Sequence, residues 1–244
     1  MKPLASFVVI VVLWEIFASG FIPPFSQVIL TFFELSINPD FLNNVWASLR
    51  RLGIGWSLGM ISGTLLGIVF ALNRNARDFL LPVVSALFPI PKVALLPLFI
   101  VLFGLGELGK IATIFIGGFF PSIINAFTCI TRTPAGLLDA ADSVGLTFIQ
   151  KVRFIILPYN LPNIIQGWRT SISLSMTLLV SAEMLGAFEG LGYWIYLTGS
   201  DMQFDHMFAG IIYLSLIGVA TNYAINWTKN FVCGWTLIEE GKQK

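Results

Sequence analysis

The sequence predicts an all-α membrane protein with six transmembrane helices and a cytoplasmic helix-turn-helix loop. Of its 244 residues, 56% are hydrophobic and only 11% are charged, whereas soluble proteins average about 25% charged residues. The 14 basic and 13 acidic side chains are too few to cover a water-facing surface, so the lipid bilayer is expected to be the main solvent. A formal net charge of +1 provides no basic field that would attract nucleic acid.

Four runs with little or no charge are long enough to cross a membrane, since about 20 helical residues span its apolar core. Residues 52–72, 111–131 and 207–228 contain no charged side chain. Residues 4–22 are interrupted only by Glu15. They lack a small-residue cleavage site, so we expect a retained first span rather than a secretory signal.

The third and fifth spans carry ionisable residues. Residues 79–105 contain Lys92 and four prolines, which predicts a bent third span, and residues 163–187 contain Arg169 and Glu183. Because charges inside a membrane are costly, these residues are candidates for function. Lys92 would attract an anion into a transport pathway. Glu183 would line a gate or the pathway, or else be a partnered structural carboxylate, and Arg169 would line the pathway or extend to the membrane surface.

The distribution of lysine and arginine predicts that both termini are cytoplasmic. Six spans put both termini on one side, and cytoplasmic loops carry the excess of basic residues. Nine such residues lie on the side of the termini and three on the other. Arg50 and Arg51 are discordant, and we interpret them as side chains that extend from the outer end of span two to the membrane surface. The nine are Lys2, Arg74, Arg77, Arg132, Lys151, Arg153, Lys229, Lys242 and Lys244, and the three are Arg50, Arg51 and Lys110.

Two local patterns indicate how the helices pack. Gly55, Gly59, Gly63 and Gly67 recur every fourth residue and form a stripe that lets another helix approach closely. We expect the stripe to pack within the same subunit, with a moving or dimeric interface as the alternative. Residues 25–34 place apolar side chains at helical spacing beside polar ones, which predicts a short helix on the outer leaflet.

The loop between spans four and five, residues 132–162, begins with signals for a short helix. Thr133 is suited to cap this helix, with Pro134 at the first position, where a missing N–H costs nothing. Gly145 is suited to end it in a left-handed conformation.

A second helix in this loop is predicted by Thr147 and Gln150, which have the spacing of a capping box. Pro158 is expected to bound it. Both helices are too short to span a membrane, and both present small and apolar side chains. The pair would therefore either seat in a groove of a partner protein or pack beneath its own bundle.

The same loop resembles the EAA coupling motif of binding-protein-dependent permeases of ATP-binding-cassette (ABC) importers. That motif reads Glu-Ala-Ala, three residues, Gly, nine residues and Ile-x-Leu-Pro, and every spacing is matched here. The one departure is an aspartate at the first position, which keeps the carboxylate but shortens its reach. The matching residues are Asp139, Ala140, Ala141, Gly145, Ile155, Leu157 and Pro158.

Further segments resemble the branch of this family that imports nitrate, bicarbonate, taurine, alkanesulfonates or precursors of thiamine and pyrimidines. Together they cover roughly residues 45–230. This branch usually has an uncharged residue where the present chain has Lys92. The segments are Pro89-Ile90-Pro91 with Ala94 and Pro97, Phe103-Gly104-Leu105-Gly106-Glu107 with Lys110, and Ala182-Glu183-Met184 with Gly190-Leu191-Gly192.

The resemblance implies one half of the membrane part of an importer with the ABC type I permease fold. It implies a single permease domain over residues 1–244 in the cell's inner membrane, a homodimer of this chain, and two cytoplasmic ATPase subunits that bind ATP and magnesium. It also implies an extracytoplasmic solute-binding protein that delivers a small solute, either anionic or a precursor-type compound. Residues 132–162 would form the coupling loop, and the seven motif residues would pass ATP-driven movement to the spans.

Other functions fit the sequence less well. Residues 104–110 match a glycine-rich phosphate-binding pattern, but no strand is predicted before them and Ile111 replaces the Ser or Thr that would bind magnesium. The chain is therefore not expected to bind ATP or another cofactor itself. His206 cannot form a metal site alone, and no catalytic constellation indicates an enzyme. A stand-alone channel or ion-coupled secondary transporter remains the alternative, because six spans do not identify an energy source.

Overall fold

The computed structural model describes residues 2–235, with the side chains of all of these except residues 2–5, 7, 8 and 80. Lys242 and Lys244, which contribute to the predicted orientation, lie outside the described residues. Apart from an isolated bridge between Ser19 and Ile22, the regular structure of the described part is helical, which confirms the all-α prediction. Its elements are α1 (Lys2–Ile16), α2 (Phe25–Leu35), α3 (Pro39–Leu72), α4 (Arg74–Leu87), η1 (Lys92–Leu95), α5 (Leu96–Phe103), α6 (Glu107–Thr131), α7 (Ala135–Ser143), α8 (Phe148–Lys151), η2 (Val152–Ile156), α9 (Leu157–Gly186), α10 (Leu191–Ser200) and α11 (Phe204–Val232).

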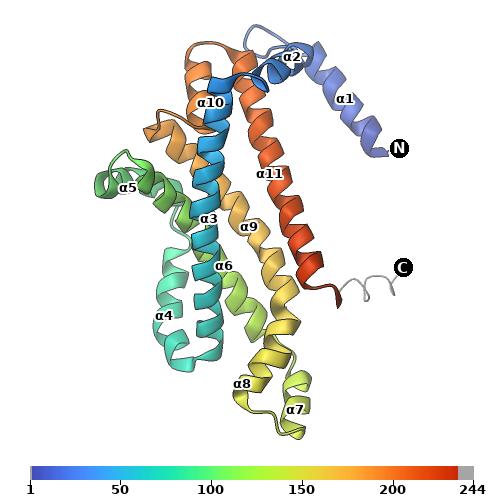
Figure 1. Cartoon of the computed structure of the whole chain (residues 1–244), viewed down its shortest axis with the longest axis vertical. Coiled ribbons are helices and arrows are strands. Elements are labelled where there is room, and N and C mark those ends of the chain that lie inside the picture. Colours follow the sequence, from blue (N-terminus) through green and yellow to red (C-terminus); the bar gives the residue numbers. More distant parts are fainter. Residues whose placement is uncertain (1, 236–244) are drawn as a thin grey trace.

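The long helices α3, α6 and α9 form the centre of the molecule (Figure 1). The predicted glycine stripe lies on the face of α3 that packs against α6. A Cβ atom at Gly59 would lie 2.3 Å from the carbonyl oxygen of Phe115, and one at Gly63 would lie 2.4 Å from that of Phe119. The two backbones thus approach too closely for a side chain, which confirms that the stripe packs within one subunit.

Helix α3 begins much earlier than the uncharged run 52–72 indicates. The Oδ1 atom of Asn38 caps it by accepting two backbone N–H groups, at 2.9 and 3.2 Å, and Pro39 occupies the first turn. The helix runs for 34 residues, about 51 Å at 1.5 Å per residue. Arg50 and Arg51 therefore lie within α3 and not at its end.

By length and composition, α3, α6 and α11 can each cross a membrane. Two bent pairs would each count as one further span: α4 with η1 and α5, bent by 90°, and α8–α9 with α10, bent by 53°. The first bend lies at the proline-containing segment 88–91, which confirms the predicted break in this stretch. Helix α1 covers only 15 residues, so the count of six spans stays a prediction.

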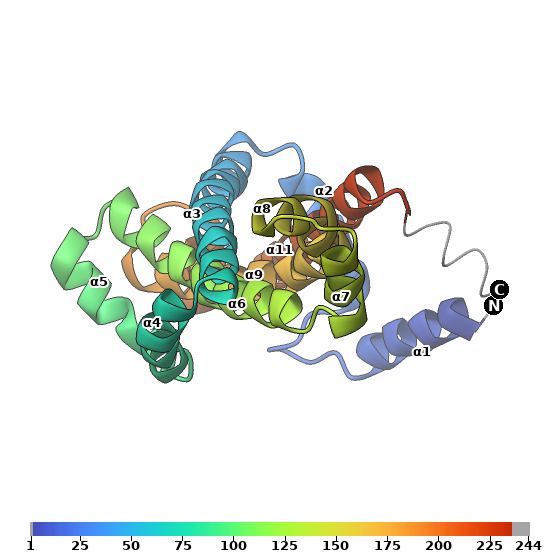
Figure 2. The same cartoon turned by 90° about the horizontal axis from the view of Figure 1, so that it is seen from below.

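The remaining helices pack at the ends of this centre or project from it. The predicted short helix α2 is present and packs against α11. Helix α1 leans away on one side, while α4 and α5 project on the other (Figures 1 and 2). Helices α7 and α8 form a hairpin at one end of the molecule, here called the hairpin end. The end near α2 and α10 is called the far end, and its apolar cluster consists of Val28, Leu35, Phe41, Leu191 and Ala209.

Candidate functional site

The hairpin between α6 and α9 is built from local backbone signals. Helix α7 ends where Gly145 adopts a left-handed conformation with φ of +77°. The N–H groups of Gly145 and Leu146 donate to carbonyl oxygens in the last turn of α7, at 2.9 and 3.1 Å, as in a Schellman cap. Thr147 is the N-cap residue before α8, and its N–H donates to Oε1 of Gln150 at 2.8 Å in a capping box. The turn is thus held at both sides by hydrogen bonds.

Two predicted helix boundaries in this hairpin are wrong. Pro134, and not Thr133, precedes the first residue of α7. The hydroxyl of Thr133 instead donates to a carbonyl oxygen at the end of α6 (2.7 Å) and accepts from Asn160 (2.8 Å). Pro158 does not end the second helix, because α8 continues through the π-helical turn η2 into α9. Pro158 occupies the first turn of α9 directly after η2, so it lies inside a continuous helical segment.

One face of the hairpin is anchored to the ends of α6 and α9. Ala141 is 3% exposed, and an ion pair between Lys151 and Asp142 joins α8 to α7. The buried cluster below the hairpin consists of Ala126, Ile130, Ile156 and Ile164. The half-buried motif residues at its base are Ile155, Leu157 and Pro158. These contacts tie the hairpin to both long helices, so we expect the three to move together.

The opposite face of the hairpin is exposed, and its tip is apolar. Val144 and Ile149 are 79% and 76% exposed, and Phe148 is exposed beside them. Asp139 and Ala140 lie on the exposed side of α7. Apolar side chains on a projecting tip are typical of a surface that a partner covers. Packing beneath its own bundle is thus confirmed for the buried face of the hairpin, and seating of the exposed face in a partner stays a prediction.

At the far end, Arg51 is completely buried, which contradicts the interpretation of its side chain as one that reaches the membrane surface. The guanidinium of Arg51 is 0% exposed and pairs with Glu107 (2.6 Å), Glu183 (2.8 Å) and Glu189 (3.0 Å). Arg50 is partly exposed and pairs with Glu107 at 2.9 Å. The carboxylates replace the hydrogen bonds of water, so the charge of Arg51 is accommodated inside the protein.

Glu183 points into the interior of its own chain. Its side chain is 0% exposed. Besides Arg51, its carboxylate accepts hydrogen bonds from the hydroxyl of Ser48 (2.8 Å) and from the N–H of Gly192 (2.9 Å). These groups belong to α3 and α10, whereas Glu183 lies near the end of α9. Of the two roles that the sequence leaves open, this geometry is that of a partnered structural carboxylate.

Sequence reasoning missed the ion cluster of the far end. Arg51 and Glu183 are 132 residues apart, so no local pattern connects them. A signal was nevertheless present, because Arg50 and Arg51 break the charge rule for loops on that side. Positive and negative charges balance within the cluster. Its members are Arg50, Arg51, Glu107, Lys110, Glu183 and Glu189.

Lys92 lines a cavity of about 240 Å³ between η1, α6 and α9. Its ammonium group donates to the carbonyl oxygen of Phe88. It lies 4.5 Å from the ring centroid of Phe88 and 5.8 Å from that of Phe120. Within the described residues no carboxylate pairs with Lys92. A cation without a counter-ion in a largely apolar cavity is suited to attract an anion.

The structure does not bring the three candidate pathway residues together. Arg169 and Glu183 lie 14 positions apart on α9, about 21 Å along the helix, and Glu183 is enclosed in the ion cluster. Arg169 is half-buried. Among the described residues its Nε atom has no hydrogen-bond partner, and no carboxylate pairs with it. Lys92 and Arg169 are therefore two cations in predicted membrane spans whose charge the described residues do not balance.

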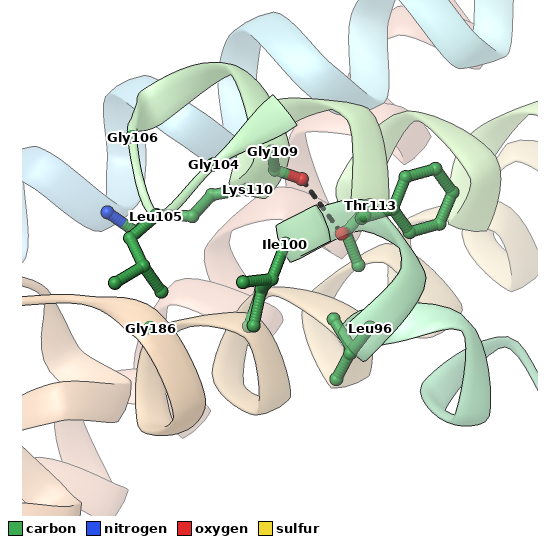
Figure 3. A pocket seen from close by; sticks show the side chains of 11 residues that line it. Leu96, Ile100, Gly104, Leu105, Gly106, Gly109, Lys110, Thr113 and Gly186 are labelled. Carbon is green, nitrogen blue, oxygen red and sulfur yellow. Dashed lines mark hydrogen bonds between the residues drawn. The ribbon is translucent and has the colours of Figure 1, made fainter. Parts of the chain in front are cut away.

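The glycine-rich segment that resembles a phosphate-binding loop forms the turn between α5 and α6 (Figure 3). Gly104 adopts a positive φ of 73°, and a helix precedes it where a phosphate-binding loop would have a strand. Lys110 pairs with Glu107 at 3.5 Å. The cavity beside this turn has a volume of about 10 Å³, which is room for roughly one water molecule and far too little for a nucleotide.

Comparison with known proteins identifies the family. The profile described as "Binding-protein-dependent transport system inner membrane component" matches residues 63–229. The taurine transport system permease protein TauC of Escherichia coli is 29% identical, over 88% of this chain and 80% of that protein. The formylaminopyrimidine transport permease protein ThiX of Halalkalibacterium halodurans is 28% identical, over 96% of both chains. The nitrate import permease protein NrtB of Synechocystis is 28% identical, over 95% of this chain and 89% of that protein.

A solved structure has the same fold. The inward-facing MetNI methionine ABC transporter matches with a TM-score of 0.66 and 22% identity, over 78% of this chain and 95% of the matched chain. Together with the family match, this confirms the expected importer permease fold and sets aside the stand-alone channel and the ion-coupled carrier. The chain belongs to the binding-protein-dependent transport system inner membrane components, and it is a permease subunit of an ABC importer.

Proposed function

We propose that this permease works as a homodimer, together with two cytoplasmic ATPase subunits that bind ATP and magnesium and a solute-binding protein on the outer side. The observation that carries the proposal is the projecting hairpin, whose exposed tip and anchored base contain the spacing of the EAA motif. In this assembly the hairpin end and both termini face the cytoplasm. The far end receives the solute from the binding protein.

The motif residues have two different tasks in this proposal. Asp139 and Ala140, on the exposed side of α7, contact the ATPase subunit. Ala141 anchors α7 to the bundle, and Gly145 makes the turn that sets the angle between α7 and α8. Closure of the ATPase dimer then moves the hairpin as a rigid body and shifts the bundle between inward-open and outward-open packings. The residues that pass this movement from the hairpin to α9 are Ile155, Leu157 and Pro158.

The solute passes beside the broken third span and α9. Lys92 attracts the solute, and Arg169 adds a second positive charge nearer the hairpin end. Glu183 supports the far end of the pathway from within the ion cluster. These two unbalanced cations favour a small anionic solute. The names of two relatives bear on this class: nitrate is an anion, and taurine is a zwitterion whose sulfonate carries a negative charge.

Co-purification with the ATPase subunit from detergent-solubilised membranes tests the assembly. Ile149→Asp places a charge on the exposed tip and is expected to abolish association, because burying an unpaired charge in an interface is costly. Phe188→Asp, at an exposed position of the far end, is the control and should leave association intact. A wild-type chain that binds no ATPase, or liposomes that contain this chain alone and accumulate solute uphill, would refute the proposal.

A further inference from the structure

Helix α9 has a polar face that its own bundle does not cover. The opposite face is buried against α3 and α6 and carries residues such as Ile172 and Leu179. The uncovered face carries four hydroxyl side chains at spacings of three and four residues, so they form one row along the helix. Over 11 positions this row extends about 16 Å, roughly half of the apolar core of a bilayer. This row, called the hydroxyl track, consists of the exposed Thr170, Ser173 and Thr177 and the half-buried Ser181.

The track differs from a face that contacts lipid. In α11 the exposed side chains include Leu216, Val219 and Trp227, which are apolar or amphipathic. Within the described residues, the hydroxyls of Ser173 and Thr177 bond only to backbone carbonyl oxygens one turn earlier, at 2.9 and 3.1 Å. A single hydroxyl bonded in this way is tolerated in lipid. A continuous row of them fits a surface that meets water or solute better than one that meets acyl chains.

The cavity of Lys92 opens onto this track. Thr177 lines the cavity with Lys92, and Gly117 of α6 provides a wall without a side chain. Arg169 lies eight positions from Thr177 on the same helix, about 12 Å away along its axis. Neither cation is paired with a carboxylate of the described residues, whereas the ion cluster of the far end is balanced. The track is therefore flanked by positive charge that the chain does not neutralise.

We propose that the hydroxyl track is the water-accessible surface along which the solute moves, and that Lys92 and Arg169 make it selective for small anions. Each hydroxyl can turn from its backbone carbonyl to donate to an oxygen of the passing anion. Exchange of one hydrogen bond for another keeps binding weak enough for the solute to be released. The inference rests on the proposed function for the direction of transport, and it assigns the solute-contacting residues of α9.

Thiol labelling tests the track without knowledge of the natural solute. Single cysteines replace Ser173 or Thr177 in the complete transporter in membrane vesicles, after the natural Cys129 and Cys233 are changed to alanine. The probes are an anionic sulfonatoethyl methanethiosulfonate and a cationic trimethylammonioethyl methanethiosulfonate. We expect the anionic reagent to react about tenfold faster than the cationic one at both positions, because local positive charge concentrates anions. Lys92→Met in the Thr177→Cys chain should remove most of this preference.

Two matched positions serve as controls. Ser175→Cys lies on the buried face of the same helix, where the native hydroxyl donates to the carbonyl oxygen of Ile114 at 3.0 Å, and Val219→Cys lies on the exposed apolar face of α11. Both should react slowly with either reagent. Equally slow reaction at Ser173→Cys and Thr177→Cys would overturn the proposal, since the track would then face lipid or a dry subunit interface. Fast reaction of both reagents without a preference for the anionic one would overturn the proposed selectivity of the track for anions.

The two proposals can fail separately. ATPase association is measured at the hairpin and involves neither Lys92 nor the hydroxyl track. If association fails while anion-selective labelling is found, the assembly is wrong and the pathway stands. If association succeeds while labelling fails, the solute takes another route.

Discussion

At the scale of single residues, Arg51 determines how the far end of the bundle is held together. A buried charge is tolerated only when its hydrogen bonds are satisfied. Arg51 on α3 meets the carboxylates of Glu107 on α6 and Glu183 on α9, and it also donates to the carbonyl oxygen of Glu189 at 2.7 Å. Three segments that are distant in sequence thus share one cation.

Removing this cation should destabilise the protein strongly. Arg51→Met leaves Glu183 buried without its counter-ion, which is expected to cost about 3–5 kcal/mol. Arg50→Met is the control, because the Arg50 side chain is partly exposed and its pairs contribute at most about 1 kcal/mol. Thermal unfolding of the detergent-solubilised protein measures both. The double variant Arg51→Met, Glu183→Met should recover part of the stability that Arg51→Met loses, because no buried carboxylate is then left unpaired. Equal destabilisation by Arg51→Met and Arg50→Met would contradict the role of Arg51.

At the scale of elements, the close approach of α3 and α6 depends on the absence of side chains. Gly59→Ala would force a methyl group against the backbone of α6, so we expect a loss of about 1–3 kcal/mol. Gly53 lies on the same helix, and a methyl group there would have no neighbouring atom within 4 Å, so Gly53→Ala should be neutral or slightly stabilising. Folded yield and thermal unfolding compare the two. Similar destabilisation by both substitutions would mean that helix packing is not the cause.

The hairpin is the element where a small backbone change is expected to affect coupling. Gly145→Ala strains a residue with positive φ by about 1–2 kcal/mol, roughly a tenfold shift in the population of the correct turn. We expect ATP hydrolysis to continue while solute uptake per ATP falls. Gly136→Ala, within α7 and with open space around it, should keep both. Proteoliposomes that hold the complete transporter allow both rates to be measured, and unchanged coupling in Gly145→Ala would argue against a rigid hairpin.

At the scale of the whole molecule, the hairpin and the segment after α9 lie at opposite ends. Cysteines placed in them should therefore react with a thiol reagent from opposite sides of the membrane. Ile149→Cys at the hairpin tip should react with an impermeant thiol reagent only from the cytoplasmic side. Phe188→Cys, at an exposed position of the far end, should react only from the outside. Right-side-out and inverted vesicles provide the two measurements. Labelling of both positions from one side would disprove the proposed orientation.

Several features were predictable from the sequence because their causes are local. The uncharged runs identified the cores of α3, α6 and α11, and the prolines around Lys92 identified a broken helix. Gly145, Thr147 and Gln150 marked the turn of the hairpin, because each acts through hydrogen bonds within a few residues. The EAA spacing lies in the same short segment, and further short segments around Pro89, Phe103 and Ala182 carried the rest of the family resemblance.

Other features were decided only by tertiary structure. The burial of Arg51 depends on carboxylates 56, 132 and 138 residues away, so the sequence suggested a surface position that the fold does not allow. Pro158 lies within a helix because α8 leads directly into α9, and the uncovered polar face of α9 is recognised only once α3 and α6 have covered the other face. Local sequence determines where helices begin and turn, because those signals act over a few residues. Which charges meet and which faces stay open depends on how distant helices assemble.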